Sequence, residues 1–206
     1  MLNRLICLIL GYFIGAIIQT GFWIGKFNHI DIRDYGSGNA GTTNTMRTLG
    51  KKAGFITYFM DAFKSCITAI IIHFIYGSNS DISEMLLILY GGFGVVLGHN
   101  FPFYLGFKGG KGIATTGGVI FAFHWQLGLI CAAVFLIITI ISKYVSLGSI
   151  CMVLIIPFIL YFNNPQDWKL VVVGCIFTAM AIWRHRANIV RLMNGTENKL
   201  GQKVKR

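Results

Sequence analysis

Acidic side chains are scarce in this sequence. Seven Asp and Glu residues stand against 18 Lys and Arg in a chain of 206 residues, and the seven form no cluster. An enzyme that transfers a phosphatidyl group from a CDP-lipid would need grouped aspartates to hold Mg²⁺. The shortage of acids therefore argues against that class of enzyme. We expect neither a metal site nor a cofactor.

Charged residues of both signs are also few. They make up 12% of the chain, whereas hydrophobic residues make up 55%. Soluble domains carry about twice that share of charge, so the composition indicates an integral membrane protein. The five cysteines all fall inside apolar runs, without metal-ligand spacing or a disulfide framework. We interpret them as packing residues.

The N-terminal region lacks a cleavage signal. Leu5 to Ile24 is a 20-residue run whose least apolar member is Gln19, and this is about the length that crosses a bilayer. Arg4 precedes the run, as in a signal peptide, but no small-residue cleavage site follows before Trp23 and Lys26. We therefore expect a retained membrane span.

The predicted fold is an all-α integral membrane protein with about seven transmembrane helices, some of them short. Helices are expected because an open strand cannot satisfy its backbone in lipid. A single domain is expected to occupy the whole chain, 1–206. The apolar spans lie at about 5–25, 55–76, 85–98, 113–123, 127–141, 145–162 and 170–183.

Charge decides the predicted topology. The segments 26–54 and 184–206 are rich in Lys and Arg, whereas 77–84 and 163–169 together hold three acids and one lysine. Basic segments stay in the cytoplasm, so this pattern places the N-terminus outside and the C-terminus in the cytoplasm. It also requires 113–141 to be split near His124-Trp125-Gln126 into two helices, since one span there would send the basic tail outside.

The formal charge of +11 is concentrated beside the apolar spans. Nucleic-acid binding is the usual interpretation of so basic a chain, but these residues are better explained as topology determinants and anion ligands. The predicted topology brings three polar segments to the cytoplasmic face: 36–54, 98–118 and 184–199.

The first polar segment, Gly36 to Gly54, reads GSGNAGTTNTMRTLGKKAG. Its short polar side chains offer hydrogen-bond donors and acceptors, and Arg47 can bind a phosphate through two nitrogens. These short polar side chains are Ser37, Asn39, Thr42, Thr43 and Asn44. A solvated loop that caps a helix starting near Ala53 is the alternative, although a cap needs only one such residue.

The second segment contains FPFYLGFKGGKGIATTGG, Phe101 to Gly118, with two lysines and six glycines. Glycine lets backbone amides approach a ligand closely, and lysine supplies a point charge for an anion. The Walker A pattern is not met, because Leu105 stands where its first glycine belongs and Gly112 follows Lys111. The chemistry indicates a phosphate cradle, and a plain interfacial turn is the alternative.

The third segment, Arg184 to Lys199, reads RHRANIVRLMNGTENK. His185, Asn188 and Leu192 share one helical face by their spacing. A basic juxtamembrane helix that binds lipid headgroups is the alternative.

Two smaller patterns have structural interpretations. Asp61 and Lys64 stand three residues apart within a predicted span, and we interpret them as a structural ion pair. His29 and Asp34 have the HxxxxD spacing of the soluble-type glycerolipid acyltransferases. No further phosphate-binding block of that family accompanies them, so we regard the spacing as coincidence.

Together the three segments resemble the bacterial acyl-phosphate:glycerol-3-phosphate acyltransferases, the PlsY family. The strings SGNAGTTNTMRTLGKKAG (37–54), GHNFPFYLGFKGGKGIAT (98–115) and HRANIVRLMNGTENK (185–199) resemble its three motifs in order and spacing. The resemblance covers essentially the whole chain. It implies transfer of a fatty acyl group from acyl phosphate to the 1-hydroxyl of glycerol 3-phosphate, which gives lysophosphatidic acid and phosphate in the first acylation of phospholipid synthesis.

The resemblance also implies roles for individual residues. Ser37 would contact a phosphate or the acyl oxygen, Arg47 and Lys111 would bind anions with the Gly109–Gly112 amides, and Glu197 would hold the third motif together by pairing with a cation. His185 and Asn188 would position the glycerol hydroxyl, with either His185 or the leaving phosphate as base. Further substrate contacts are implied for Asn39, Asn44, His99, Lys108, Gly109, Gly110, Gly112 and Thr115.

The implied setting is the bacterial inner membrane, with several spans and a site that faces the cytoplasm. Glycerol 3-phosphate, acyl phosphate, membrane lipid and other phospholipid-synthesis enzymes are the implied partners, and nucleic acid is not. A membrane transporter for organic phosphates is the main alternative, because basic residues at helix ends also suit a translocation path. It predicts ionisable residues at mid-membrane and an inverted repeat; only Asp61 and Lys64 fit, and no repeat is evident.

Overall fold

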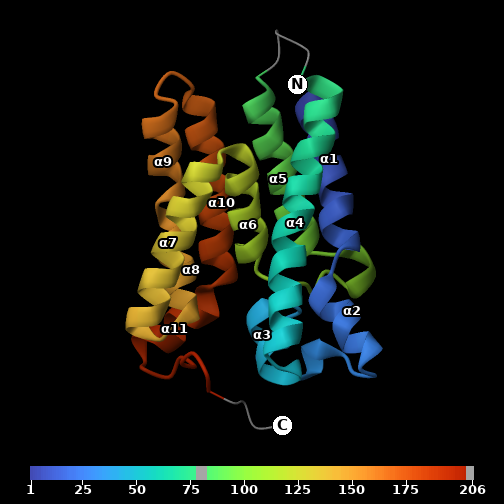
Figure 1. Cartoon of the computed structure of the whole chain (residues 1–206), viewed down its shortest axis with the longest axis vertical. Helices are drawn as coiled ribbons and strands as arrows, with labels where there is room; N and C mark the ends of the chain where they lie inside the picture. The colour runs from blue at the N-terminus through green and yellow to red at the C-terminus, as the bar shows by residue number, and fades with distance from the viewer. Residues whose placement is uncertain (78–82, 203–206) are drawn as a thin grey trace. The chain divides into compact units, whose positions relative to one another are not determined.

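The computed structural model describes residues 1–77 and 83–202, and its regular elements there are all helical (Figure 1). This confirms the prediction of an all-α protein. The helices are α1 Leu2–Ile17, α2 Thr20–Phe27, η1 Ile32–Asp34, α3 Thr42–Leu49, α4 Lys51–Tyr76, α5 Glu84–Asn100, η2 Phe103–Leu105, α6 Ile113–Phe123, α7 Trp125–Ser142, α8 Val145–Leu154, α9 Ile156–Asn163, α10 Trp168–Arg184 and α11 Arg186–Met193.

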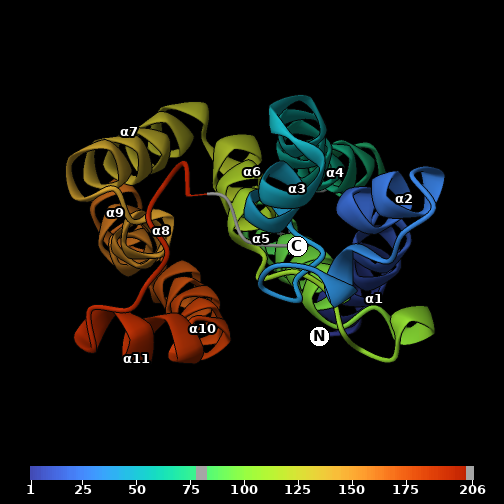
Figure 2. The same cartoon turned by 90° about the horizontal axis from the view of Figure 1, so that it is seen from below.

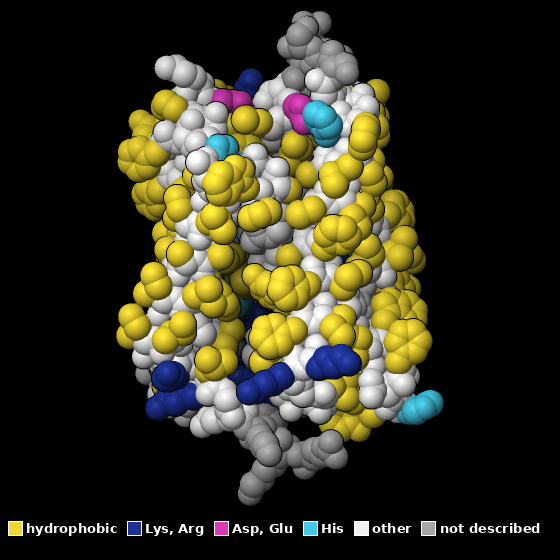
Figure 3. Space-filling model, in the orientation of Figure 1, with side chains coloured by type: hydrophobic (Ala, Val, Ile, Leu, Met, Phe, Trp, Pro, Cys, Tyr) yellow, Lys and Arg dark blue, Asp and Glu magenta, His cyan; other side chains and the backbone are white. Residues whose placement is uncertain are grey.

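Five helical stretches within the described ranges are long and apolar enough to cross a membrane, or six if α10 and α11, bent by 60°, form one span. The first of the five joins α1 to α2, and the last joins α8 to α9. Helix α6 occupies the remaining predicted span but has only 11 residues, about 16 Å at 1.5 Å per residue. Hydrophobic side chains cover the flanks of the helices, as a lipid-facing surface requires (Figure 3).

The chain divides into two compact units, unit 1 from Met1 to Phe123 and unit 2 from His124 onward to Gln202. The division falls where α6 ends and α7 begins, at the residue pair that the charge pattern marked for a turn. The split of the 113–141 region into two helices is therefore confirmed. The expected outer segment 77–84 includes residues 78–82, and the basic tail includes residues 203–206; both lie outside the described residues.

The segment 36–54 is more helical than expected. The alternative interpretation, a solvated loop that caps a helix near Ala53, is wrong, because α3 already forms at Thr42–Leu49 and α4 begins at Lys51. Gly50 separates the two with φ of +92°, a conformation that residues with a side chain rarely adopt. Helix α3 buries Asn44 and Thr45, so its polar residues partly serve packing.

In unit 1, helices α1 and α5 lie in backbone contact along their length (Figure 2). Glycines make this approach possible on both sides. A Cβ on Gly15 of α1 would collide with the Val95 carbonyl, and a Cβ on Gly98 of α5 would collide with the Tyr12 carbonyl. Small residues at helix contacts are the usual means of close packing in membranes.

The first apolar run does not form one continuous helix. It breaks between α1 and α2 at Ile18 and Gln19, whose backbone leaves the helical region. Two buried polar side chains bind the carbonyls near the break: Gln19 Nε2 lies 3.0 Å from the Gly15 oxygen, and Lys64 Nζ lies 2.8 Å from the Ile18 oxygen. Gln19, the least apolar residue of the run, thus has a structural reason to be polar.

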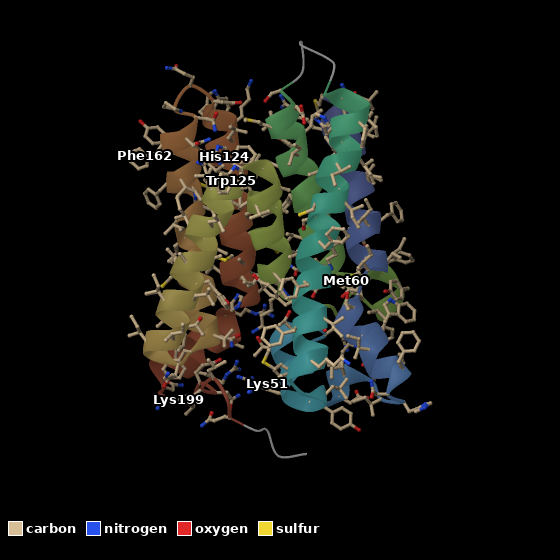
Figure 4. The ribbon with its side chains drawn as sticks, viewed as in Figure 1. Lys51, Met60, His124, Trp125, Phe162 and Lys199 are labelled. Atoms are coloured by element: carbon tan, nitrogen blue, oxygen red, sulfur yellow. The ribbon has the colours of Figure 1, made fainter. Side chains whose placement is uncertain are left out.

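In unit 2, α8 lies between α7 and α10 and contacts α11. Thr178 Oγ1 of α10 donates to the Val153 carbonyl of α8 at 2.7 Å, so a buried hydroxyl joins the two helices. Figure 4 shows Lys199 at the end of unit 2 opposite His124, Trp125 and Phe162. The third motif therefore follows α10 at the end of this unit farthest from the α6–α7 turn.

All five cysteines are free thiols. Cys7 and Cys131 are buried, as expected of packing residues, and Cys66 and Cys151 are partly buried. Cys175 is exposed on α10, so the packing interpretation is wrong for it. An apolar run in a membrane protein can face lipid as readily as protein.

We expect Gly94→Ala to destabilise unit 1, because its Cβ would collide with the Leu8 carbonyl of α1 and the main chain cannot rotate away. Overpacking of this kind costs about 1–3 kcal/mol. Gly117→Ala is the matched control, since a Cβ there meets nothing within 4 Å. Thermal unfolding in detergent should show a lower midpoint for Gly94→Ala alone. Equal midpoints for the two variants would contradict the backbone contact of α1 and α5.

Candidate functional site

The loop before α3 presents Ser37 to solvent. Gly36 and Gly38 flank it with φ of +59° and +69°, so the turn depends on glycine at both sides. The Ser37 amide donates to Asn44 Oδ1 at 2.8 Å, and Asn44 Nδ2 donates to the carbonyls of Ile32 at 2.9 Å and Tyr35 at 3.0 Å. Asn44 is buried. Its amide is used to hold the Ser37 loop in shape.

The other candidate residues of the first segment lie close along the chain. Asn39 is partly buried just before α3, with its Oδ1 near Gly41. Arg47 lies in the last turn of α3 and is also partly buried. Helix α3 therefore separates the polar loop from Arg47, a separation that the sequence did not predict.

Arg33 connects the first segment to the second, and sequence reasoning assigned it only a topological role. Its Nη1 donates to the Leu105 carbonyl at 2.8 Å, 72 residues away. Its Nη2 forms a 2.7 Å ion pair with Asp31, which holds the pKa of that carboxyl below its usual value, mainly through the Arg33 hydrogen bond. No sequence pattern marked this link, because its acceptor is a backbone oxygen.

The glycine–lysine loop folds back on the end of α5. The Gly109 amide donates to the Asn100 carbonyl at 3.2 Å, and the Gly110 amide donates to the His99 carbonyl at 3.0 Å. The expectation that all amides from Gly109 to Gly112 face an anion is therefore wrong for Gly109 and Gly110. A side chain at Gly110 would collide with the His99 ring, so glycine here allows the loop to pack on His99.

Two buried polar side chains lie behind this loop. The amide of Asn100 is fully buried and has no hydrogen-bond partner among the described residues, and the same holds for the Thr115 hydroxyl. A Cβ on Gly112 would lie 3.0 Å from Asn100 Oδ1. Thr115 was predicted as a substrate contact, whereas Asn100 was missed although it directly follows His99, another predicted contact. Lys108 is exposed and Lys111 partly buried on the same loop.

The predicted ion pair of Asp61 and Lys64 is confirmed, with Nζ 3.0 Å from Oδ1 and both side chains buried. It has a third member that sequence reasoning did not connect to it. Lys64 Nζ lies 2.8 Å from His99 Nδ1, and His99 is itself buried. The pair in α4 thus contacts the residue on which the glycine–lysine loop packs.

In unit 2, His185 stands between α10 and α11 with one ring nitrogen fixed. Its Nδ1 lies 2.8 Å from the Ala181 carbonyl oxygen. A carbonyl can only accept, so Nδ1 carries the proton and Nε2 of the neutral ring keeps its lone pair. His185 is therefore held in the form that can accept a proton.

Glu197 gathers the third segment around its carboxylate. Its Oε1 accepts from Asn188 Nδ2 at 2.8 Å and from Ser146 Oγ of α8 at 3.1 Å, and its Oε2 accepts from Arg191 Nε at 2.7 Å. Burial raises the pKa of Glu197, but the bonds from Asn188 and Arg191 outweigh it, so the pKa lies below its usual value. Pairing of Glu197 with a nearby cation is thus confirmed.

The candidate residues divide between the units. Unit 1 holds the candidates for anion binding; unit 2 holds a proton-accepting histidine with its neighbouring amide and their carboxylate support. Those of unit 1 are Ser37, Asn39, Asn44, Arg47, His99, Lys108, Gly109, Gly110, Lys111, Gly112 and Thr115, and those of unit 2 are His185, Asn188 and Glu197.

Comparison with known proteins gives this arrangement a family. Residues 5–195 match the family model described as glycerol-3-phosphate acyltransferase. The glycerol-3-phosphate acyltransferase of Lactiplantibacillus plantarum is 43% identical over 195 residues, which cover 94% of this chain and 90% of the relative. That of Clostridioides difficile is 40% identical over 205 residues, which cover 98% and 97%.

Two solved structures have the same fold. Both are crystal structures of PlsY, an integral membrane glycerol 3-phosphate acyltransferase, one in a glycerol 3-phosphate form and one in a lysophosphatidic acid form. The first has a TM-score of 0.85 at 37% identity, covering 96% of each chain. The second has a TM-score of 0.83 at 36% identity, covering 96% of this chain and 95% of the other. This chain therefore belongs to the glycerol-3-phosphate acyltransferase family and is a multi-pass membrane protein.

Proposed function

We propose that this acyltransferase takes its acyl group from acyl phosphate and delivers it to the 1-hydroxyl of glycerol 3-phosphate. The main support is the match of residues 5–195 to the glycerol-3-phosphate acyltransferase family model. The similar PlsY crystal structures, in glycerol 3-phosphate and lysophosphatidic acid forms, support it as well. Transfer of an acyl group to glycerol 3-phosphate follows from the family; acyl phosphate as the donor is the proposal. Transport of organic phosphates is not favoured.

The chemistry of acyl phosphate limits what the protein must supply. Its carbonyl is already activated, so no acyl-serine intermediate is needed. The glycerol oxygen attacks the carbonyl carbon, the bond from that carbon to the phosphate oxygen breaks, and phosphate leaves with the electron pair. The hydroxyl proton passes to His185 Nε2 or to the leaving phosphate. Alignment of the reactants lowers such a barrier by about 7–11 kcal/mol.

His185 is the base that the geometry of unit 2 supports. Nδ1 is committed to the Ala181 carbonyl at 2.8 Å, so the lone pair is on Nε2. Asn188 stands one turn away with its Nδ2 held by Glu197, and this bond fixes the amide that orients the glycerol hydroxyl. Glu197 supports Asn188 from behind and takes no proton in the reaction.

Anion binding falls to the residues of unit 1. Arg47 and Lys111 bind the phosphate groups, with Lys108, Ser37, Asn39 and the Gly112 amide around them. The bonds within the Ser37 loop support a different part for Asn44, which shapes that loop. The Gly109 and Gly110 amides hold the lysine loop to α5, and Thr115 faces the same region from the first turn of α6.

The proposed setting is the inner membrane of a bacterium. Seven spans, with the N-terminus outside and the C-terminus in the cytoplasm, form a single domain whose motif segments 36–54, 98–118 and 184–199 face the cytoplasm. The charge pattern supports this orientation, since 26–54 and 184–206 are the basic segments. Lysophosphatidic acid would then pass to other phospholipid-synthesis enzymes in the same membrane.

An assay with alternative donors tests the proposed reaction. The purified protein in detergent would receive glycerol 3-phosphate with palmitoyl phosphate, palmitoyl-CoA or palmitoyl-carrier protein. We expect phosphate release that depends on glycerol 3-phosphate, lysophosphatidic acid as product, and no turnover of the thioesters. Turnover of thioesters alone would overturn the donor assignment, and bound glycerol 3-phosphate without turnover of any donor would favour transport.

Lys111→Ala should raise the KM for glycerol 3-phosphate by roughly tenfold to a hundredfold, because a hydrogen bond to a charged group contributes about 1.5–3 kcal/mol. Lys169→Ala is the control, since it removes the same charge from an exposed residue in the first turn of α10. Initial rates over a range of glycerol 3-phosphate concentrations measure both. An unchanged KM in Lys111→Ala would remove Lys111 from the phosphate site.

Ser37 separates two mechanisms. If it only donates a hydrogen bond, Ser37→Ala keeps measurable activity, and the wild-type protein incubated with palmitoyl phosphate alone shows no added acyl mass. Intact-protein mass spectrometry after a rapid quench makes that measurement. An acyl adduct on Ser37 would establish covalent catalysis and contradict the direct transfer proposed above.

Glu197→Gln should lower the free energy of unfolding at pH 7 by an amount on the order of 1 kcal/mol, because the charged partner of Arg191 is lost. Thermal unfolding in detergent measures this change as a lower midpoint temperature. The pKa of Glu197 is lowered in the folded protein, so its contribution is full above the unfolded pKa and disappears as pH falls through the folded pKa. The two melting curves should therefore converge at acidic pH.

Arg191→Met supplies the matched comparison for Glu197. The double variant Glu197→Gln/Arg191→Met should be little less stable than either single variant, since the two residues share one interaction. Additive losses in this cycle, or a difference between wild type and Glu197→Gln that persists at low pH, would contradict the supporting role.

A further inference from the structure

Lys64 is a fully buried cation whose surroundings a structural ion pair does not explain completely. Its Nζ lies 3.0 Å from Asp61 Oδ1, 2.8 Å from the Ile18 carbonyl oxygen and 2.8 Å from His99 Nδ1. All three contacts lie within unit 1. An ammonium has three hydrogens and no lone pair, so it is saturated by three acceptors. Each hydrogen of Lys64 therefore has one acceptor.

The contact with Lys64 bears on the protonation of His99. With Lys64 charged, Nζ can only donate, so Nδ1 is the acceptor and carries no proton. The single ring proton of the neutral imidazole is then on Nε2. Asp61 Oδ1 is 3.6 Å from the same Nδ1, beyond hydrogen-bonding distance, so the carboxylate neutralises Lys64 and does not draw a proton to Nδ1.

The Nε2 edge of His99 faces the glycine–lysine loop. A Cβ built on Gly110 would collide with Nε2 of His99, which places that nitrogen directly against the loop backbone. The carbonyl of the same residue accepts the Gly110 amide at 3.0 Å. His99 therefore holds the loop through its backbone carbonyl, and its Nε2 edge lies against Gly110, the residue before Lys111.

We propose that Lys64, neutralised by Asp61, is a positioning residue that holds His99 as an Nε2–H donor toward phosphate bound at the loop of residues 109–112. The assignment rests on the proposed function for the identity of the anion. Lys64 touches neither substrate nor the reacting atoms. It acts through His99, whose donating nitrogen adds a directed hydrogen bond to the charge of Lys111.

A purely structural role for the Asp61–Lys64 pair is the competing explanation, and it requires fewer contacts. Joining α4 to the α1–α2 break requires only the bond from Lys64 to Ile18 and the charge of Asp61. It gives no reason for Nζ to contact Nδ1 of His99, nor for the other ring nitrogen to face the loop. The tautomer of His99 tests its contact with Lys64, and the KM for glycerol 3-phosphate separates the two explanations.

Nitrogen NMR of the full-length protein in detergent, labelled with ¹⁵N-histidine, reads that proton directly. His99→Gln identifies the His99 signals among the five histidines. We expect an unprotonated Nδ1 and a protonated Nε2 in the wild-type protein without substrate. A proton on Nδ1, or on both nitrogens, would overturn the proposal, and this result is independent of any activity.

The variant Asp61→Asn/Lys64→Met removes both charges together, since removal of one alone would leave an unpaired buried charge. Thr57→Val is the control; it removes a buried hydroxyl of α4 that donates to the Ala53 carbonyl of its own helix. We expect the Nδ1 signal of His99 to move in the double variant, which lacks the ammonium donor, and to stay unchanged in the control. An unchanged His99 pattern in the folded double variant would overturn the proposal.

Kinetics complete the test. The double variant should raise the KM for glycerol 3-phosphate by roughly tenfold or more, the effect of one hydrogen bond to a charged group, with a smaller change in kcat. A fall in kcat alone at constant KM would contradict a role in phosphate binding and favour the structural explanation. If the double variant does not fold, a proton on Nδ1 of His99 in the wild-type protein still overturns the proposal. If the wild-type protein shows no acyl transfer, the proposed function fails while the His99 assignment is still judged by NMR.

Discussion

The structure of unit 1 depends on a single constraint: every backbone carbonyl that leaves a helix inside the membrane must find a partner. The break at Ile18 and Gln19 creates such carbonyls, and the side chains of Gln19 and Lys64 donate hydrogen bonds to them. Gln19 Nε2 also reaches the Gly98 and His99 carbonyls at 3.2 Å, so the partner of the break is the end of α5. The glycine–lysine loop begins there. The same side chains therefore satisfy the carbonyls at the break in the first span and position the start of the second motif.

The same constraint gives the two motif histidines opposite chemistry. His99 receives a hydrogen bond on Nδ1 from an ammonium, whereas His185 gives one from Nδ1 to the Ala181 carbonyl. In each histidine the group bonded to Nδ1 determines which ring nitrogen carries the proton. His99 is left with a donor and His185 with an acceptor, although both are buried histidines at the ends of membrane helices.

Sequence reasoning predicted the helical spans, the turn at His124 and the polar segments, because apolar runs, charge and glycine leave direct traces in composition. It also predicted the Asp61–Lys64 pair, since a charge in an apolar span needs a partner, and the family resemblance implied the pairing of Glu197. It did not predict helix α3, the Arg33 link to Leu105, or the Gly109 and Gly110 bonds to α5. These depend on backbone carbonyls that any residue could supply, so no residue type marks them. Asn44 shows the limit most clearly: its polarity indicated a ligand contact, but its bonds go to its own loop.

The scarcity of acids acquires a physical explanation from the structure. Three of the seven carboxylates each form an ion pair with Arg or Lys: Asp31 with Arg33, Asp61 with Lys64, and Glu197 with Arg191. A carboxylate paired in this way adds no net negative charge near substrates that carry phosphate. Each carboxylate also orients a neighbouring side chain. Asp31 orients Arg33 toward the Leu105 carbonyl, Asp61 orients Lys64 toward His99, and Glu197 holds Asn188. These three carboxylates therefore act as orienting groups as well as partners of cations.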